Sequence, residues 1–209
     1  MRGYLLLVTG VIAVVVMVLT SSIAYSLALE RGFEEEDSVM IANGLGEAVT
    51  LFLVLPAVYS SPLKRLFKAE KALRRGVALY LLCSFVMIAG GLLISMFFEV
   101  KYEPIFEKVS LLYSALILLV VAPVVEELIF RGLILHGLKE YTGDLIAAVA
   151  SSLFFAVLHY TSIPIPLLFV IFLDGFLLSY YMLKWRNLLS LIIAHTLINL
   201  QALLFYWLI

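Results

Sequence analysis

The sequence predicts an all-α, polytopic membrane protein, a bundle of about seven transmembrane helices with eight as the alternative. The first observation is composition: 64% of the 209 residues are hydrophobic and 14% are charged. Soluble domains are typically about 45–50% apolar and about 25% charged. The second observation is that the apolar runs are long and continuous, whereas barrel strands would alternate. The net charge of −1 gives no basic field that would attract nucleic acid.

Each expected span is an apolar run of the length that a spanning helix needs, about 17–25 residues or somewhat more. Short polar or proline-containing connections separate the runs. We divide the chain into amino-terminal transmembrane helices, 1–108, and a carboxy-terminal helical core, 109–209. The expected spans are 3–29, 39–59, 76–98, 109–138, 145–163, 167–183 and 188–209.

The orientation follows from the basic residues, which are unevenly shared between the two sides of the seven-span arrangement. Six of them lie in the connection 64–75. With that connection in the cytoplasm, ten Lys and Arg residues lie inside and three lie outside. Cytoplasmic loops carry such an excess of basic residues. We therefore expect a multi-pass protein with a cytoplasmic amino terminus and an outside carboxyl terminus.

Three charged residues, Glu126, Glu127 and Arg131, interrupt the apolar run 109–138. One charge at the centre of a spanning helix costs about 2.5–3.5 kcal/mol, so these charges need partners. Glu127 and Arg131 are four residues apart and share a helix face, which favours an ion pair. Glu126 is rotated by about 100° from that face and is left for another role. Pro123, just before the pair, is expected to kink the helix.

Other polar residues of the carboxy-terminal half are expected at similar depth in the membrane. Counting about 1.5 Å per residue from the cytoplasmic end of each span places them roughly 10–22 Å deep. His195 and Asn199 also share a helix face, because they are four residues apart. For Glu47 and Asp174 the sequence leaves two interpretations open: a functional role, or a polar side chain whose hydrogen bonds are satisfied between packed helices. The residues at shared depth are Glu126, Glu127, Arg131, His159, Asp174, His195 and Asn199.

The chemistry of this set points to hydrolysis of an acyl bond by activated water. A carboxylate can take a proton from water, and Asn and His can donate to a developing oxyanion. Other protease chemistries lack their signatures: the sequence has no His-Glu-x-x-His helix and no Gly-x-Ser-x-Gly turn. Asp174 has no aspartate partner on another span, which disfavours an aspartyl dyad.

Three motifs in order resemble those of the CPBP family, the CAAX prenyl endopeptidases and bacteriocin-processing and self-immunity proteins. They are Glu126-Glu127-x-x-x-Arg131, Phe155-x-x-x-His159 and His195-x-x-x-Asn199. The resemblance implies an intramembrane endopeptidase with a cavity open to the cytoplasm. In it Glu126 would activate the water with help from His159, His195 and Asn199 would stabilise the oxyanion, and Glu127 and Arg131 would organise the site.

The resemblance also implies which cofactor and which partners to expect. The family is described both as metalloproteases and as glutamate-dependent enzymes; a divalent metal, zinc, would be held by Glu126, His159 and His195 with one position open. The expected substrate is a peptide or protein, including lipidated ones such as prenylated CAAX termini. Membrane lipids are expected contacts, and the oligomeric state is open. The alternative function is a non-catalytic membrane scaffold or self-immunity factor of the same fold.

Overall fold

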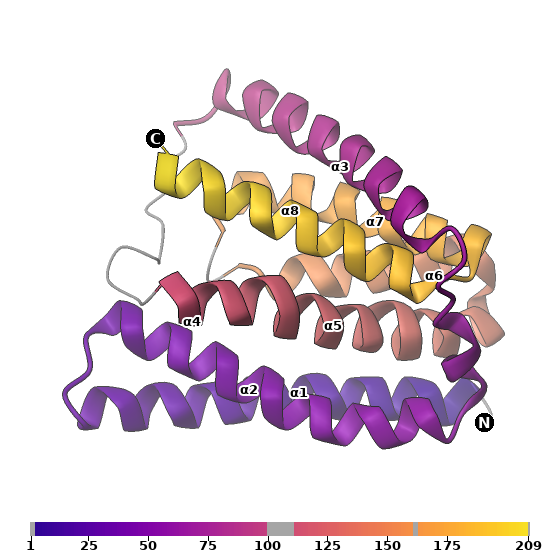
Figure 1. Cartoon of the computed structure of the whole chain (residues 1–209), viewed down its shortest axis with the longest axis horizontal. Coiled ribbons are helices and arrows are strands. Elements are labelled where there is room, and N and C mark those ends of the chain that lie inside the picture. The colour runs from indigo at the N-terminus through magenta and orange to yellow at the C-terminus, as the bar shows by residue number, and fades with distance from the viewer. Residues whose placement is uncertain (1–2, 100–110, 161–162, 209) are drawn as a thin grey trace.

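The computed structural model describes residues 3–99, 111–160 and 163–208, and these form helices without a strand. The predicted connection 99–108, apart from Glu99, and the predicted first residues of the fourth span lie outside the described residues. Figure 1 shows the helices as one bundle. They are α1 (Gly3–Glu30), α2 (Glu35–Tyr59), α3 (Ala72–Ser95), α4 (Leu111–Leu116), α5 (Ala122–Glu127), α6 (Leu135–Val157), α7 (Leu168–Trp185) and α8 (Leu188–Leu208).

Six helical stretches of the described chain are long and apolar enough to cross a membrane. The fourth, Leu112–Val157, has 46 residues and contains one non-helical residue, Gly143, with φ 79° and ψ 176°. Only glycine adopts this backbone conformation readily. The chain reverses direction at Gly143. The hydrogen bond from Ser151 Oγ, after the turn, to the carbonyl of Phe130, before it, shows that the two segments lie side by side. The expectation of about seven spans is therefore close, and α1 begins and α8 ends at opposite ends of the bundle (Figure 1).

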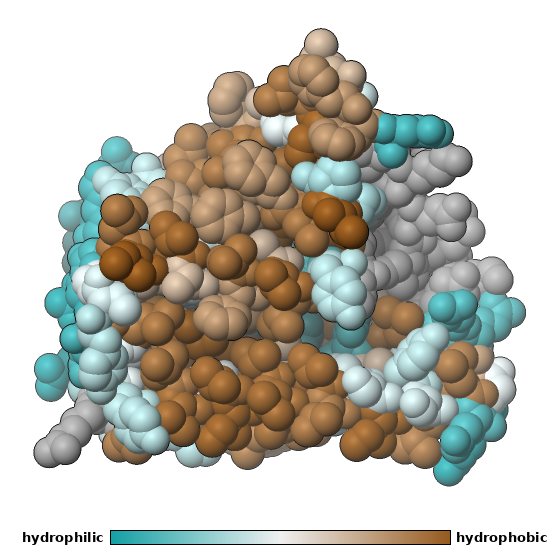
Figure 2. All heavy atoms as spheres, turned by 180° about the vertical axis from the view of Figure 1, so that it is seen from behind, coloured by the Kyte–Doolittle hydropathy of each residue, from teal (hydrophilic) through white to brown (hydrophobic). Residues whose placement is uncertain are grey.

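The surface has the pattern of a protein embedded in a bilayer. Figure 2 shows hydrophobic residues across the middle of one face and hydrophilic residues gathered at its two opposite ends. Large apolar side chains such as Phe52, Phe85 and Leu92 are more than 60% exposed. Such exposure would be costly in water but not in lipid. The chain is thus an integral, multi-pass membrane protein.

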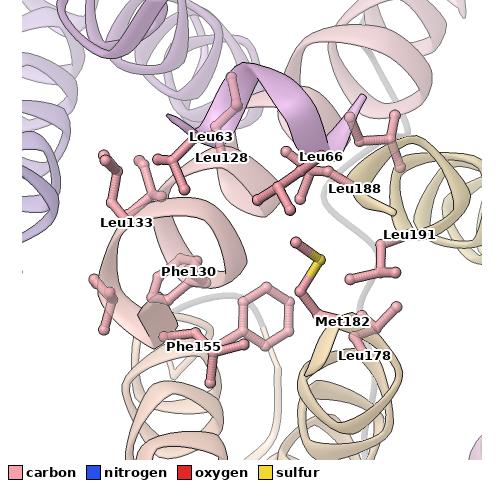
Figure 3. Packing of buried hydrophobic residues seen from close by; sticks show 14 of the residues in the cluster. Leu63, Leu66, Leu128, Phe130, Leu133, Phe155, Leu178, Met182, Leu188 and Leu191 are labelled. Carbon is pink, nitrogen blue, oxygen red and sulfur yellow. The ribbon is translucent and has the colours of Figure 1, made fainter. Parts of the chain in front are cut away.

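A cluster of buried apolar side chains packs between the helices at the centre of the bundle (Figure 3). The short 3₁₀ helix η1 (Pro62–Leu66) contributes Leu63 and Leu66 to this cluster and so joins α2 to α3. Lipid tails are as apolar as these side chains, so close van der Waals packing, rather than water exclusion, stabilises the helix contacts.

The kink expected at Pro123 stays a prediction, and the helix departs from regular α-helical geometry on both sides of this residue. A π-helical turn, Ile117–Val121, precedes α5, and a second, Leu128–Ile134, follows it. Pro123 stands near the start of α5, but the preceding π-turn continues directly into α5, so the missing N–H deprives carbonyls of that turn of a partner. π-turns are often found at functional sites. The helix therefore continues through Pro123 and carries both glutamates. Several other boundaries differ from those expected: for example, α2 begins inside the acidic stretch, at Glu35, α3 begins at Ala72 rather than residue 76, and α6 ends at Val157 rather than residue 163.

Candidate active site

The expected pair between Glu127 and Arg131 is present and fully buried. Arg131 Nη1 donates to Glu127 Oε1 at 2.9 Å, and both side chains are 0% exposed. Arg131 Nη2 donates to the carbonyl of Gly175 in α7 at 3.2 Å. The guanidinium carbon also lies 4.4 Å from the centre of the Phe155 ring, a cation–π distance. The pair thus connects α5, the π-turn Leu128–Ile134, α6 and α7 at the centre of the bundle.

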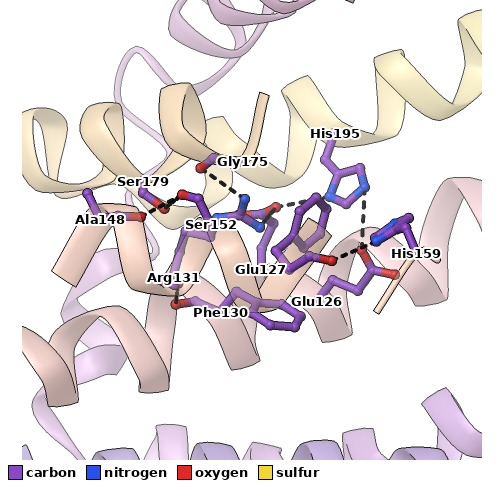
Figure 4. Close-up of polar contacts among 12 residues, drawn as sticks. Glu126, Glu127, Phe130, Arg131, Ala148, Ser152, His159, Gly175, Ser179 and His195 are labelled. Atoms are coloured by element: carbon purple, nitrogen blue, oxygen red, sulfur yellow. Dashed lines mark hydrogen bonds and ion pairs between the residues drawn. The ribbon is translucent and has the colours of Figure 1, made fainter. Parts of the chain in front are cut away.

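His195 joins this pair to the neighbouring glutamate. Its Nδ1–H donates to Glu127 Oε1 at 2.9 Å, and its Nε2 lies 3.7 Å from Glu126 Oε2. The bond to Glu127 sets the orientation of the imidazole and puts the proton of the neutral ring on Nδ1. Nε2 therefore faces Glu126, as Figure 4 shows.

Glu126 lies on a different side of α5 from Glu127, at the wall of a cavity of about 500 Å³. Its side chain is 16% exposed, and its Oε2 has no hydrogen-bond partner in the described chain. His159, His195 and Asn199 line the same cavity from the end of α6 and from α8. The structure thus brings together four of the residues selected from the sequence, and their catalytic roles remain predictions.

His159 has one ring nitrogen engaged and one free. Its Nδ1–H donates to the backbone carbonyl of Phe155 at 2.8 Å, which leaves Nε2 as an acceptor in the neutral ring. The Phe155 ring packs against His159 at 4.6 Å and against His195 at 5.9 Å between ring centres. Phe155 therefore packs against both imidazoles.

Asn199 has a structural contact that the sequence did not suggest. Pro123 has no N–H, so the carbonyls four and five residues before it, Leu119 and Leu118, receive no bond from it. Asn199 Nδ2 donates to Leu118 O at 2.8 Å, and Thr196 Oγ1 donates to Leu119 O at 3.0 Å. Side chains of α8 thus satisfy the carbonyls that the proline leaves open. The signal was available, since the proline and a polar row on the last span are both visible in the sequence.

The amino-terminal helices contribute to the cavity as well. Ser21 and Ser22 of α1 and Asn43 and Glu47 of α2 line it opposite the carboxy-terminal residues. The division at residue 108 remains a prediction, but the cavity takes its walls from both parts.

Two other polar residues lie apart from the cavity. Asp174 is buried in α7 at 5% exposure and does not line the cavity, although its expected depth matched that of the site. His136, which the sequence reading passed over, has its Nδ1 2.7 Å from the carbonyl of Arg131, where it satisfies a carbonyl of the second π-turn. Depth along a span does not report which way a side chain points.

The three residues expected to bind a metal have suitable side chains, but their placement does not form a metal site. Two imidazoles with anchored Nδ1 atoms and a carboxylate are the chemistry that zinc prefers. However, no three His, Cys, Asp or Glu side chains of the described ranges are placed to hold a metal ion. As they lie, the three expected ligands are not grouped as a metal centre, and the metal stays a prediction.

The fold and the cavity together define a multi-pass membrane protein with a buried carboxylate–imidazole site. Residues 108–201 match the family model described as Rce1-like, type II CAAX prenyl endopeptidase. The resemblance to the CPBP and CAAX protease family is thereby shown. At the level of the family, the match supports a CAAX-type intramembrane protease, hence a peptide or protein substrate. No curated protein and no solved structure was found to match the chain.

Proposed function

We propose that this protein is an intramembrane endopeptidase that uses Glu126 to activate water. The observation that carries the proposal is the shared cavity, in which Glu126 from α5, His159 from the end of α6, and His195 and Asn199 from α8 meet. Glu126 and the Nε2 atom of His159 are both acceptors, so a water between them would be oriented and polarised from two sides. Glu126 takes the proton as the water oxygen attacks the scissile carbonyl carbon.

The oxyanion that forms is met by His195 in this proposal. In this proposal Nε2 takes a proton from solvent before the attack, so that Nε2–H donates to the oxyanion while Nδ1 stays bonded to Glu127, and this proton stays on the ring through the reaction. Glu127 and Arg131 do not touch the substrate and act as positioning residues. Asn199 has one amide hydrogen bonded to Leu118, so its second amide hydrogen is the one available for the oxyanion.

The substrate class we propose is a lipidated carboxy-terminal peptide of the CAAX type. The support is the family description together with the composition of the cavity wall, which combines polar groups with apolar residues such as Met17, Met40 and Leu203. A prenylated peptide has both chemistries, an apolar tail and a polar backbone.

The experiment is cleavage of a farnesylated CAAX peptide by purified protein in detergent or liposomes. Wild-type protein should release the terminal tripeptide, and Glu126→Gln should not, while the matched control Glu30→Gln, at an exposed position outside the cavity, should cleave at the wild-type rate. Cleavage by Glu126→Gln at the wild-type rate would refute the assignment of the base.

The divalent metal stays a prediction from the sequence. Elemental analysis of wild-type and His159→Ala protein measures it directly. Zinc bound to wild-type protein and lost in the variant would support the three-ligand site, whereas full cleavage by metal-free protein would contradict it.

The orientation also belongs to the proposal: the basic connection 64–75 and the residues 184–187 face the cytoplasm. Reporter fusions after Arg75 and after Ile209 should lie on opposite sides of the membrane. Both fusions on one side would contradict an odd number of spans.

A further inference from the structure

Among the described residues that line the cavity, Glu47 is the second carboxyl group, after Glu126, and it belongs to none of the three motifs and has no role in the proposed mechanism. It lies on α2, 8% exposed, and lines the same cavity as Glu126. Its Oε2 has no hydrogen-bond partner, and the residue makes no ion pair within the described chain. A nearly buried carboxyl group with an unpartnered oxygen at the wall of a catalytic cavity calls for a ligand.

The packing of α2 holds Glu47 at this position. Gly46 lies against α1, where a Cβ atom would collide with Ser21 and with the backbone oxygen of Met17. The helix therefore approaches α1 as closely as only a glycine permits, and the next residue, Glu47, faces the cavity. Thr50, on the following turn, is fully buried and bonds to its own helix at Gly46 O, 2.7 Å.

The surroundings of Glu47 and Glu126 differ in a way that suits two different tasks. Glu126 is more exposed and has the imidazole of His195 at 3.7 Å as a neighbour. Glu47 has no cationic neighbour of this kind, and none of the described residues that line the cavity is Lys or Arg. Both carboxyl groups line the same cavity, so a charge on Glu47 would share it with a charge on Glu126. Two like charges facing one low-dielectric cavity are unfavourable, so the unpaired group is the one that keeps a proton.

We propose that Glu47 is the general acid of the reaction, the group that protonates the leaving amine. This inference rests on the proposed function. The water gives one proton to Glu126 and forms the new C–O bond at the carbonyl carbon. Glu47 then gives its proton to the scissile nitrogen, the C–N bond breaks, and the products are a carboxylic acid and an amine. The proton held by Glu126 returns to Glu47 through solvent, which restores both groups.

The test compares two substrates that differ only in their need for an acid. One is the farnesylated CAAX peptide, and the other is the same peptide with sulfur in place of the scissile nitrogen. A thiolate leaves without prior protonation, because thiols ionise near pH 8.5. Glu47→Gln should lower kcat/KM for the amide about 100-fold, the usual effect of losing a general acid. It should lower kcat/KM for the thioester less than about threefold.

Matched variants separate catalysis from folding. Glu47→Asp keeps an acid and should recover part of the amide cleavage, whereas Thr50→Val changes the same helix without touching the cavity and should affect both substrates equally. Equal losses on both substrates for Glu47→Gln, or no loss on the amide, would overturn the inference while leaving Glu126 as the base. Failure of wild-type protein to cleave either substrate would overturn the proposed function and this inference with it.

Discussion

Glu126 and Glu127 are neighbours in the chain, yet they lie in opposite surroundings. Glu127 is 0% exposed and has two partners, Arg131 and His195, each at 2.9 Å. Glu126 is 16% exposed, lines a cavity, and has an Oε2 without a hydrogen bond. The rotation of about 100° between successive helical residues places one carboxylate in the core and the other at the cavity.

This difference assigns Glu127 to the stability of the fold and Glu126 to the chemistry of the cavity, although the two residues are adjacent in the chain. A buried charge that loses its partner destabilises the fold. Removing either Glu127 or Arg131 is therefore expected to lower the free energy of unfolding, because the other charge stays buried. A carboxylate left free of partners is available to a substrate or a water. Each prediction below tests whether the two sides of α5 are as separate as the structure indicates.

The largest expected effect is on activity at Glu126. Glu126→Gln should reduce cleavage by about 10²–10⁴-fold, because the base is lost. Thermal unfolding in detergent should match wild type, since the substitution breaks no hydrogen bond of Oε2. A strongly lowered melting temperature would show that Glu126 also supports the fold and would break the comparison.

The opposite signature is expected on the other side of the helix. Arg131→Ala leaves Glu127 buried with less than its full set of partners and should cost about 3–5 kcal/mol of stability. The measurement is reversible unfolding in mixed micelles by a denaturing detergent. The exposed Arg65→Ala is the control and should unfold like wild type. Unchanged stability of Arg131→Ala would contradict the pairing.

A smaller effect is expected where α8 satisfies the carbonyls before Pro123. Asn199→Ala and Thr196→Val each remove one interhelical bond and should each cost about 1–2 kcal/mol. Activity should separate them: only Asn199 lines the cavity, so only Asn199→Ala should also lower kcat. Equal activity of the two variants would make Asn199 a purely structural residue.

The smallest effect tests one neutral bond near the buried pair. Ser151 Oγ donates to Phe130 O at 2.8 Å and joins α6 to the second π-turn. Ser151→Ala should cost about 0.6 kcal/mol, the average for such bonds in a membrane. Ser26→Ala, whose hydroxyl bonds within its own exposed helix, should change stability less. A loss of several kcal/mol at Ser151 would mean that neutral bonds, not the ion pair, hold this region.

The sequence predicts the spans well because hydropathy reports burial in lipid directly. Helix α7, for example, begins one residue and ends two residues from the expected range 167–183. The pairing of Glu127 with Arg131 was also predictable, since it depends on spacing within one helix. The placement of Glu126 with His159 depends on the reversal at Gly143, which the expected connection 139–144 anticipated.

What the sequence could not supply is the direction of side chains between helices. Asp174 and Glu47 are both single acids in apolar runs, yet only Glu47 lines the cavity. That difference arises from how α2 and α7 are rotated against their neighbours, and span composition does not contain this angle. The π-turns are likewise invisible, because they depend on partners such as Ser151 and His136 on other turns and helices.

The second π-turn has a consequence for the length of the chain. A π-turn holds one residue more than the α-helical turn that it replaces, so Leu128–Ile134 could lose one residue and still be helical. The shortened helix would have regular geometry, but α5 would be turned by about 100° relative to α6. Glu126 would then leave the cavity wall. The number of residues between the first two motifs therefore fixes the rotation of α5 relative to α6. A one-residue deletion in this π-turn would preserve the helix but would disrupt the site.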